Sequence, residues 1–92
     1  MGGLLGNPLG FKRILKAKDD LNNIEDGEYS YINNDNPSNI YGTDTNTLLI
    51  QMTTYNRQDV WQIAFCANGR KVGIRLKYAG EWRQWKDIVT EL

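Results

Sequence analysis

Apolar and polar side chains alternate along much of the C-terminal half of the chain. From residue 71 to residue 78 the period is two, which is typical of a half-buried strand. The apolar face of this strand is expected to carry Val72, Ile74, Leu76 and Tyr78. Residues 47–53 alternate in the same way, and their expected core-facing side chains are Leu48, Ile50 and Met52. Together with the segment between them, these two strands are expected to form a half-buried sheet.

Residues 60–66 are apolar on both faces except at Gln62, which predicts a central strand between these two. Asn68-Gly69 follows it and favours a type I′ hairpin turn, because that turn needs a positive φ at both central residues. Residues 28–33 are the expected first strand. Ala79-Gly80 starts a further reversal, after which the chain returns through Trp85.

The N-terminal segment has a different character. Residues 1–10 are rich in glycine and include a proline, and residues 11–16 are expected to form one amphipathic turn of helix. In residues 19–24 an Asp can cap a single helical turn whose apolar side chains are Leu21 and Ile24. We therefore expect an arm or linker over residues 1–17 and one β domain over residues 18–92. The predicted fold is mainly β: a small antiparallel meander of about five strands, as a knob-like sheet or sandwich, with one short N-terminal helical turn.

Residues 34–46 show no periodicity and contain many Asn, Asp, Ser, Thr and Gly residues, which predicts a long surface loop without apolar anchors. Binding residues concentrate on loops that a rigid scaffold holds. Asn39 and Tyr41 in this loop are therefore candidate ligand-binding residues, together with Tyr55 and Trp82 in later turns. A carbohydrate is the ligand that such rings and amides would suit, although turn formation explains most of these residues.

The composition excludes several functional classes. Eleven basic and eleven acidic residues give a net charge of zero, so no overall field favours nucleic acid or a membrane surface. The chain has no histidine and a single cysteine, Cys66, which leaves no histidine-based catalytic triad, no disulfide framework and no cysteine zinc site. No apolar run is long enough to span a membrane. We expect a protein that is not an enzyme and binds no cofactor or metal.

Lysine and arginine residues lie beside the tryptophans in the last third of the chain, notably Arg75 and Lys77. Small β domains can bind single-stranded nucleic acid with such a surface, because bases stack on rings and phosphates contact cations. The same residues can instead pack on the rings as cation–π partners, and the neutral net charge favours this second interpretation. Nucleic-acid binding therefore stays as the alternative function.

Trp82 and Trp85 lie three residues apart, beside a turn and in the returning strand respectively. We expect Trp85 to be buried against Ile74 and Leu76, and Trp82 to be partly exposed and packed with an arginine or lysine. The expected structural residues of the domain are Trp85, Trp61, Arg75 and Gln62.

Several short motifs in this order resemble the pyocin-knob domains of bacteriophage and tailocin tail fibres. They are Asp20-Leu21-Asn22, Gly27-Glu28-Tyr29, Gln62, Arg75 and the closing segment Trp82-Arg83-Gln84-Trp85-Lys86-Asp87-Ile88. The resemblance covers about residues 18–88. It departs from the family pattern at Arg83 and Gln84, where small residues are common, and in the Asn-rich loop, which has no family motif.

The resemblance implies a structural protein of the virion, in a tail fibre or baseplate. Such a β-knob would space other domains or contribute to receptor binding and host attachment at bacterial surface glycans. Residues 1–17 would then be a junction to the rest of the fibre. The implied partners are two further copies of the chain in a homotrimer, and other tail proteins.

The sequence offers independent support for a trimer. Residues 60–66 present Trp61, Ile63 and Phe65 on one face, more apolar surface than a single thin sheet readily covers. Phe11, Ile14 and Leu15 also lack an evident partner. Burial against neighbouring subunits would stabilise a domain of only 92 residues.

Overall fold

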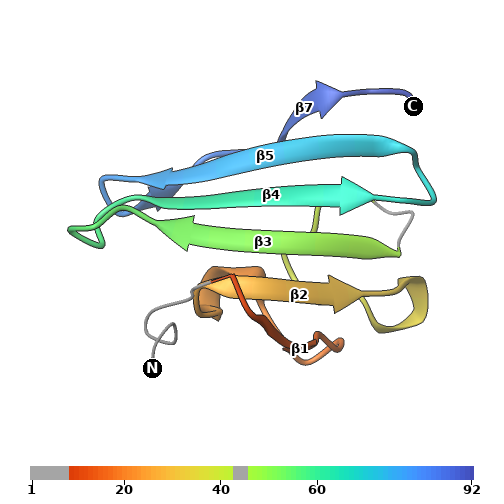
Figure 1. Ribbon diagram of the computed structural model, residues 1–92, viewed down its shortest axis with the longest axis horizontal. Helices are drawn as coiled ribbons and strands as arrows, with labels where there is room; N and C mark the ends of the chain where they lie inside the picture. The colour runs from red at the N-terminus through yellow and green to blue at the C-terminus, as the bar shows by residue number, and fades with distance from the viewer. Residues whose placement is uncertain (1–8, 43–45) are drawn as a thin grey trace.

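The computed structural model describes residues 9–42 and 46–92, and these residues form one seven-stranded sheet (Figure 1). The strands are β1 (Phe11–Ile14), β2 (Gly27–Tyr31), β3 (Thr47–Thr53), β4 (Val60–Cys66), β5 (Lys71–Tyr78), β6 (Glu81–Trp82) and β7 (Lys86–Val89). Two short 3-10 helices, η1 (Leu21–Asn23) and η2 (Asn33–Asp35), lie outside the sheet. The strand order is β1-β2-β3-β4-β5-β6, and β7 also pairs with β5.

The mainly β fold and the position of the third predicted strand are confirmed. Strands β3, β4 and β5 have the predicted bounds, and β4 lies between the other two. The sheet is mixed, however, because β1 pairs in parallel with β2 while the pairs from β2 to β6 are antiparallel. The sheet also has more strands than the predicted five.

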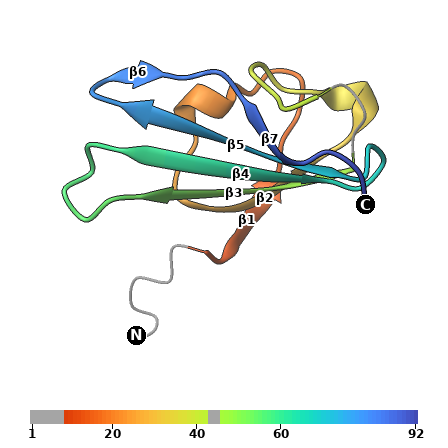
Figure 2. The ribbon, with the colours of Figure 1, turned by 90° about the horizontal axis from the view of Figure 1, so that it is seen from above.

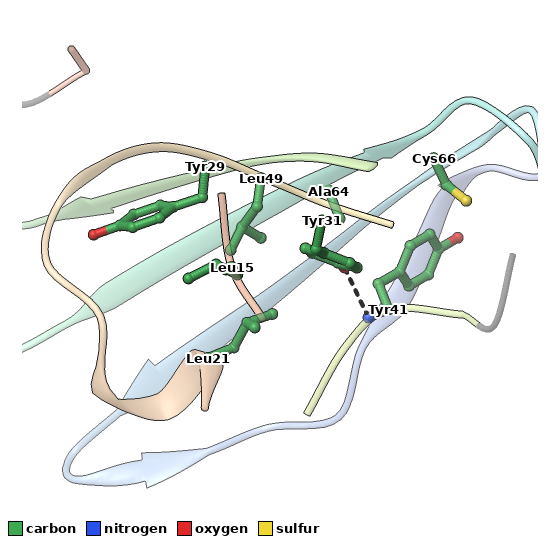
Figure 3. Packing of buried hydrophobic residues seen from close by; sticks show 8 residues of the cluster. All are labelled: Leu15, Leu21, Tyr29, Tyr31, Tyr41, Leu49, Ala64 and Cys66. Carbon is green, nitrogen blue, oxygen red and sulfur yellow. Dashed lines mark hydrogen bonds between the residues drawn. The ribbon is translucent and has the colours of Figure 1, made fainter. Parts of the chain in front are cut away.

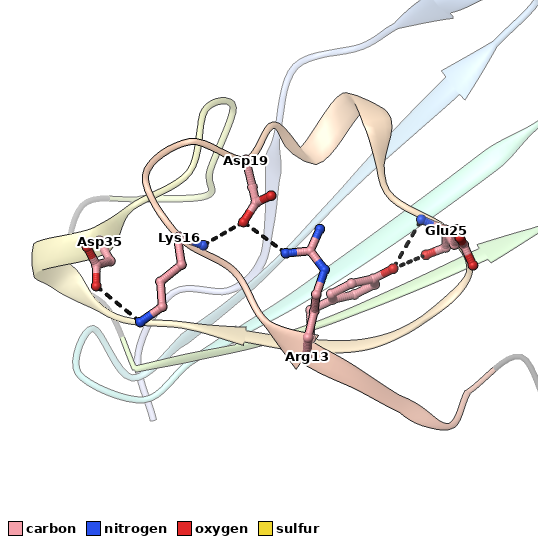
Figure 4. A network of polar contacts seen from close by, with 6 residues as sticks. Arg13, Lys16, Asp19, Glu25 and Asp35 are labelled. Carbon is pink, nitrogen blue, oxygen red and sulfur yellow. Dashed lines mark hydrogen bonds and ion pairs between the residues drawn. The ribbon is translucent and has the colours of Figure 1, made fainter.

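The prediction of a helical turn in residues 11–16 is wrong, since this segment forms β1 and the residue after it enters the core. The backbone N–H of Leu15 donates to the carbonyl of Ser30 at 2.8 Å, and the Leu15 side chain is fully buried. An ion pair from Arg13 to Asp19 (3.0 Å) and one from Lys16 to Asp35 (3.4 Å) tie the segment to the neighbouring loops (Figure 4). A backbone hydrogen-bond partner at the sheet edge outweighs the helical preference of an isolated turn. Residues 11–15 are thus part of the folded domain.

The predicted capped turn in residues 19–24 is confirmed as η1. Asp20 is the N-cap, and its carboxylate accepts a hydrogen bond from the backbone N–H of Asn22 at 2.9 Å. That bond is the largest cause of a lowered pKa for Asp20, followed by a bond from the Asn39 side chain. Leu21 is fully buried beneath the turn.

The two turns that follow β4 and β5 differ from the sequence-based expectation. Between β4 and β5 the positive φ is at Arg70 (52°), and neither Asn68 nor Gly69 adopts one. The connection is therefore not a type I′ turn at Asn68-Gly69. The two-residue turn between β5 and β6 has positive φ at both Ala79 (54°) and Gly80 (84°), as a type I′ turn requires.

Among residues 9–42 and 46–92, the segments outside the sheet gather on one face of its central strands (Figure 2). In this edge-on view η1, residues 32–42 and the segment from β6 to β7 all lie on the same side of β3, β4 and β5. We call this side the covered face and the opposite side the open face. The core lies on the covered face and consists of Leu15, Leu21, Tyr29, Tyr31, Tyr41, Leu49, Ala64 and Cys66 (Figure 3).

Large and small side chains complement one another across this core. Tyr29, Leu49, Ala64 and Gly73 form one row of paired residues, running from a large side chain on β2 to none on β5. The Tyr41 ring fills the space over Gly73, where an added Cβ would lie 2.3 Å from its Cε1 atom. Residues 32–42 are therefore anchored to the sheet by a buried aromatic ring.

The expectation that Leu48, Ile50 and Met52 face the core is wrong. The side chains of β3 that the structure buries are Thr47, Leu49 and Gln51, which point to the covered face. On β5, Ile74 and Leu76 likewise belong to the open face, because their partners in the sheet are Ile63 and Trp61. The more apolar face of the central strands is the open one.

Nine apolar residues in three rows form the surface that we call the apolar grid. Each row crosses β3, β4 and β5, and the rows are Leu48–Phe65–Val72, Ile50–Ile63–Ile74 and Met52–Trp61–Leu76. Trp61 and Phe65 expose 39% and 40% of their surface, although Trp61 was expected to be a structural residue of the domain. No layer of the described chain lies over this grid in Figure 2, and Leu92 borders it at the Leu48–Phe65–Val72 row.

Candidate functional site: a polar network and the cleft above it

A row of buried polar side chains crosses the covered face at the η1 end. Gln51, Gln62 and Arg75 are direct partners on β3, β4 and β5. Nε2 of Gln62 donates to Oε1 of Gln51 at 2.7 Å, and Oε1 of Gln62 accepts from Nε of Arg75 at 2.7 Å. Antiparallel pairing places all three side chains on the same face, where they form a continuous chain.

This network connects the sheet to the segment that covers it. Gln62 also donates to the carbonyl of Leu21 (2.7 Å), and Gln51 donates to the carbonyl of Ile24 (2.9 Å). Nη2 of Arg75 donates to Oδ1 of Asn22 at 2.9 Å. Because a buried polar group without a partner is costly, these bonds fix where η1 lies on the sheet.

Asp26 extends the network towards solvent. Its carboxylate accepts hydrogen bonds from Oγ1 of Thr53 at 2.7 Å and from Nε2 of Gln51 at 3.3 Å. Both carboxylate oxygens are used, so the side chain is held in one orientation.

Arg75 is buried, with 6% of its surface exposed, and it donates to two neutral side-chain oxygens, Oε1 of Gln62 and Oδ1 of Asn22. Desolvation lowers the pKa of the guanidinium to about 10, against the opposing influence of Asp20 and Tyr31. Two indole rings compensate part of the lost hydration, since Cζ of Arg75 lies 3.8 Å from the Trp82 ring centroid and 5.2 Å from that of Trp85. The group remains charged at neutral pH.

The expected packing of Trp82 is confirmed and that of Trp85 is wrong. Trp82 is half-buried and contacts Arg75, with Lys77 Nζ 6.0 Å from its centroid. Trp85 is also only half-buried, and it lies on the covered face, away from Ile74 and Leu76. Its ring centroid is 5.3 Å from that of Tyr41, and its Nε1 donates to the carbonyl of Asn39 at 3.0 Å.

A cleft of about 950 Å³ lies on the covered face beside η1. We call it the η1 cleft. Its floor includes Thr53, Val60 and Lys77, which form the next row of paired residues beyond the Gln51–Gln62–Arg75 row. The remaining lining comes from four parts of the chain, namely Lys12 of β1, the stretch from η1 to β2 (Asn22, Ile24, Glu25, Asp26), residues of β3 and its hairpin (Gln51, Thr54, Tyr55, Arg57) and Trp82 of β6.

The four predicted ligand-binding residues separate into two pairs. Tyr55 and Trp82 both line the η1 cleft, from the β3–β4 hairpin and from β6. Asn39 and Tyr41 do not line it, and Tyr41 is a core residue, with its hydroxyl donating to the carboxylate of Asp87. The expectation that residues 34–46 lack apolar anchors is therefore wrong; residues 43–45 of that loop lie outside the described residues.

The basic residues of β5 do not form an exposed platform beside the tryptophans. Arg75 is buried in the network, and Lys71 Nζ lies 4.9 Å from the centroid of the Tyr41 ring. Together with Lys77 over Trp82, these contacts are the cation–π packing that the neutral net charge favoured.

Sequence analysis missed the cleft residues Asn22, Asp26, Gln51, Thr53 and Arg57. They are distributed over η1, β3 and two loops, and no short motif connects them. One signal was present in the sequence: each of the three central strands carries a polar residue, Gln51, Gln62 or Arg75, among its apolar ones. The observed register places these three side chains on one face of adjacent strands.

Within residues 9–42 and 46–92 no group of three or more His, Cys, Asp or Glu side chains could hold a metal ion. The same residues contain no helix with the length and apolar character needed to cross a membrane. Comparison of the chain with models of known families, with curated proteins and with solved structures gives no match.

Proposed function

We propose that this chain is a structural module of a bacteriophage or tailocin tail fibre or baseplate, and that it assembles as a homotrimer through the apolar grid. In this role it spaces other tail proteins or contributes to contact with bacterial surface glycans. The location is the virion. The resemblance of residues 18–88 to pyocin-knob domains suggests the class of protein, and the uncovered apolar grid is the observation that supports assembly.

The grid is unusual for the surface of a monomer because it is contiguous. All nine positions are apolar, and the flanking positions on β2 are Glu28 and Ser30, so that a polar strand borders it on one side. A contiguous apolar patch with a polar rim is typical of a protein interface. The absence of charge within the grid fits a second copy of the same surface better than a charged partner.

The size of the grid suits threefold packing. Three strands spaced by about 4.8 Å form a strip about 14 Å wide. If three such strips form the sides of a triangle, each sheet lies about 4 Å from the axis. Packed sheets are about 10 Å apart, which leaves about 5 Å for the side chains of each sheet. A three-strand strip is therefore about the width at which the side chains of three copies fill the centre.

Covering the grid would also be favourable in energy. Trp and Phe side chains bury about 150–250 Å² each when inside a protein. With 39% of Trp61 and 40% of Phe65 exposed, about 80 Å² of each remains in water. Burying both would contribute about 4 kcal/mol per chain at about 25 cal/mol per Å², before the entropic cost of association.

The alternative function, binding of single-stranded nucleic acid, is supported less well, because Arg75 and Lys77 of β5 pack against the Trp82 ring. It required exposed basic residues beside exposed rings. Arg75 is buried and hydrogen-bonded to Gln62 and Asn22, so it is not available to phosphates. No retention on immobilised oligonucleotides is expected at physiological salt.

Light scattering after size exclusion tests the assembly. The wild-type chain should have the mass of three copies at micromolar concentration, and Trp61→Glu should have the mass of one, because it would place three carboxylates close to the axis. Circular dichroism checks that Trp61→Glu remains folded. Tyr55→Glu is the matched control: it adds the same charge at an exposed aromatic residue outside the grid, and should stay trimeric.

Two results would contradict this proposal. One is a wild-type chain with the mass of a monomer, and the other is a trimer that persists in Trp61→Glu. For the role at the cell surface, fluorescently labelled trimer is mixed with a panel of Gram-negative and Gram-positive cells and sedimented. Co-sedimentation with some strains and not with others is expected of host attachment, whereas a pure spacer would bind none.

A further inference from the structure

We propose that the η1 cleft binds a neutral or N-acetylated sugar residue of an oligosaccharide, with Trp82 as the stacking surface. This inference rests on the recognition part of the proposed function, and it places recognition in the η1 cleft rather than in residues 34–46. The cleft volume of about 950 Å³ is sufficient for two or three sugar rings.

The chemistry of the lining favours a ligand with many hydroxyl groups. The lining includes the hydroxyls of Thr53, Thr54 and Tyr55 and the amides of Asn22 and Gln51, side chains that carry both donors and acceptors. A hydroxyl group both donates and accepts, so it can pair with either kind of neighbour. An ionised phosphate or sulfate group offers acceptors only, and the carboxylates of Glu25 and Asp26 in the lining would repel it.

The charges of the lining also favour a neutral ligand. Lys12, Arg57 and Lys77 contribute three positive groups, and Glu25 and Asp26 contribute two negative ones. These signs are mixed within a single cleft and nearly cancel. The cleft therefore has no strong preference for a polyanion or a polycation, and a neutral ligand is desolvated there at the lowest electrostatic cost.

The two aromatic residues stand at positions suited to sugar rings. Trp82 comes from β6 and Tyr55 from the β3–β4 hairpin, at the end of the sheet where both turns lie (Figure 2). The apolar face of a sugar ring stacks on aromatic rings, which leaves the equatorial hydroxyls to the polar lining. Tyr55 is fully exposed and makes no core contact that would explain an aromatic side chain there.

The stacking surface is pre-organised. The guanidinium of Arg75 lies 3.8 Å from the centroid of Trp82, and Arg75 is itself fixed by Gln62 and Asn22. On the cleft wall, Asp26 is held by Thr53 and Gln51. Binding therefore requires little ordering of these side chains, which reduces its entropic cost. The buried network thus orders the side chains of the cleft in addition to holding η1 in place.

The test begins with an array of bacterial oligosaccharides that includes neutral, N-acetylated, phosphorylated and sulfated members. Hits are then titrated into isotopically labelled protein and followed by NMR, where the indole N–H of Trp82 is a direct reporter. We expect hits among the neutral or N-acetylated members, with shifts concentrated at Trp82, Thr53 and Tyr55.

Variants locate the site. Trp82→Ala should weaken binding at least tenfold, whereas Tyr78→Ala, the matched control at an exposed aromatic residue outside both the cleft and the apolar grid, should leave the affinity within twofold. Because Trp82→Ala also removes a contact of Arg75, Tyr55→Ala serves as a second variant: Tyr55 is exposed, so its loss leaves the fold intact. We expect Tyr55→Ala to weaken binding at least threefold.

Three outcomes overturn the inference: no hit on the array, hits confined to phosphorylated or sulfated members, or binding that Trp82→Ala and Tyr55→Ala leave unchanged. Assembly is measured separately by mass. A monomeric wild-type chain that binds sugar through Trp82 would support this inference and refute the trimer, and a trimer without sugar binding would do the reverse.

Discussion

Replacement of Gln62 by leucine should remove a large part of the stability of the domain. Gln62 is fully buried and makes three hydrogen bonds of 2.7 Å, to the carbonyl of Leu21, to Oε1 of Gln51 and from Nε of Arg75. Leucine has a similar volume, so little cavity is created. The substitution leaves three buried polar groups without their Gln62 partner: the carbonyl of Leu21, Oε1 of Gln51 and the N–H at Nε of the Arg75 cation.

The expected loss in the free energy of unfolding follows from these three hydrogen bonds. Each of the two neutral groups left unpaired costs about 1 kcal/mol, and the charged one about 1.5–3 kcal/mol, which gives a total of about 4 kcal/mol. A chain of this length has a free energy of unfolding of about 5–14 kcal/mol. At about 4–8 °C per kcal/mol, the melting temperature should fall by roughly 16 °C or more.

Urea denaturation followed by tryptophan fluorescence measures this loss directly. The midpoint should fall while the slope with urea stays the same, because the amount of surface exposed on unfolding does not change. Gln84→Leu is the matched control, since Gln84 is exposed in the turn between β6 and β7, and its effect should stay within about 0.5 kcal/mol. A loss below about 1 kcal/mol in Gln62→Leu would refute the account of the network.

A double-mutant cycle separates the network from simple packing. Arg75→Met removes the cation that Gln62→Leu leaves unpaired, so the double variant should lose less than the sum of the two single losses. We expect a coupling energy of about 1.5–3 kcal/mol between these two positions. Additive losses would mean that the two side chains contribute independently.

Three further predictions concern other parts of the fold. Ala79→Asn should stabilise the domain by about 0.5–1 kcal/mol in urea denaturation, because φ is 54° at Ala79 and asparagine tolerates this conformation in a type I′ turn; a loss of stability would contradict that assignment. Gly73→Ala should cost about 1–3 kcal/mol in the same assay, since the new Cβ would lie 2.3 Å from the Tyr41 ring; no loss would mean that the ring does not lie there. Burial raises the pKa of Tyr31 and of Tyr41 to about 12 from 10.0, so the stability that their neutral hydroxyls provide is complete below pH 10 and is lost as the pH rises from 10 to about 12. The urea midpoint should therefore fall across that window, and Tyr31→Phe should reduce the fall; an unchanged pH dependence in Tyr31→Phe would count against this origin.

Local patterns in the sequence determined η1 and the three central strands. The alternation in residues 47–53, 60–66 and 71–78 fixed the bounds of β3, β4 and β5, because successive side chains of a strand point to opposite faces. An Asp before Leu21 identified the N-cap of η1 for an equally local reason, a hydrogen bond between residues two apart. These signals depend on neighbours in the chain and need no knowledge of the fold.

Tertiary structure decided which face of the sheet is inside. The alternation in β3 has an apolar phase at Leu48 and Ile50 and a mixed phase at Leu49 and Gln51, and the mixed phase is buried. The reason is non-local: side chains from distant segments, including Leu15 and Tyr41, cover that face and supply the apolar contacts that its own strands lack.

The η1 cleft likewise depends on contacts between segments that are distant in the chain. Its walls come from η1, from the β3–β4 hairpin and from β6, which only the folded sheet brings together. The buried polar row Gln51–Gln62–Arg75 also depends on register, because a shift of one residue between neighbouring strands would turn these side chains to opposite faces. The sequence by itself thus determined the three central strands, and the pairing of those strands with segments far along the chain decided what each face of the sheet does.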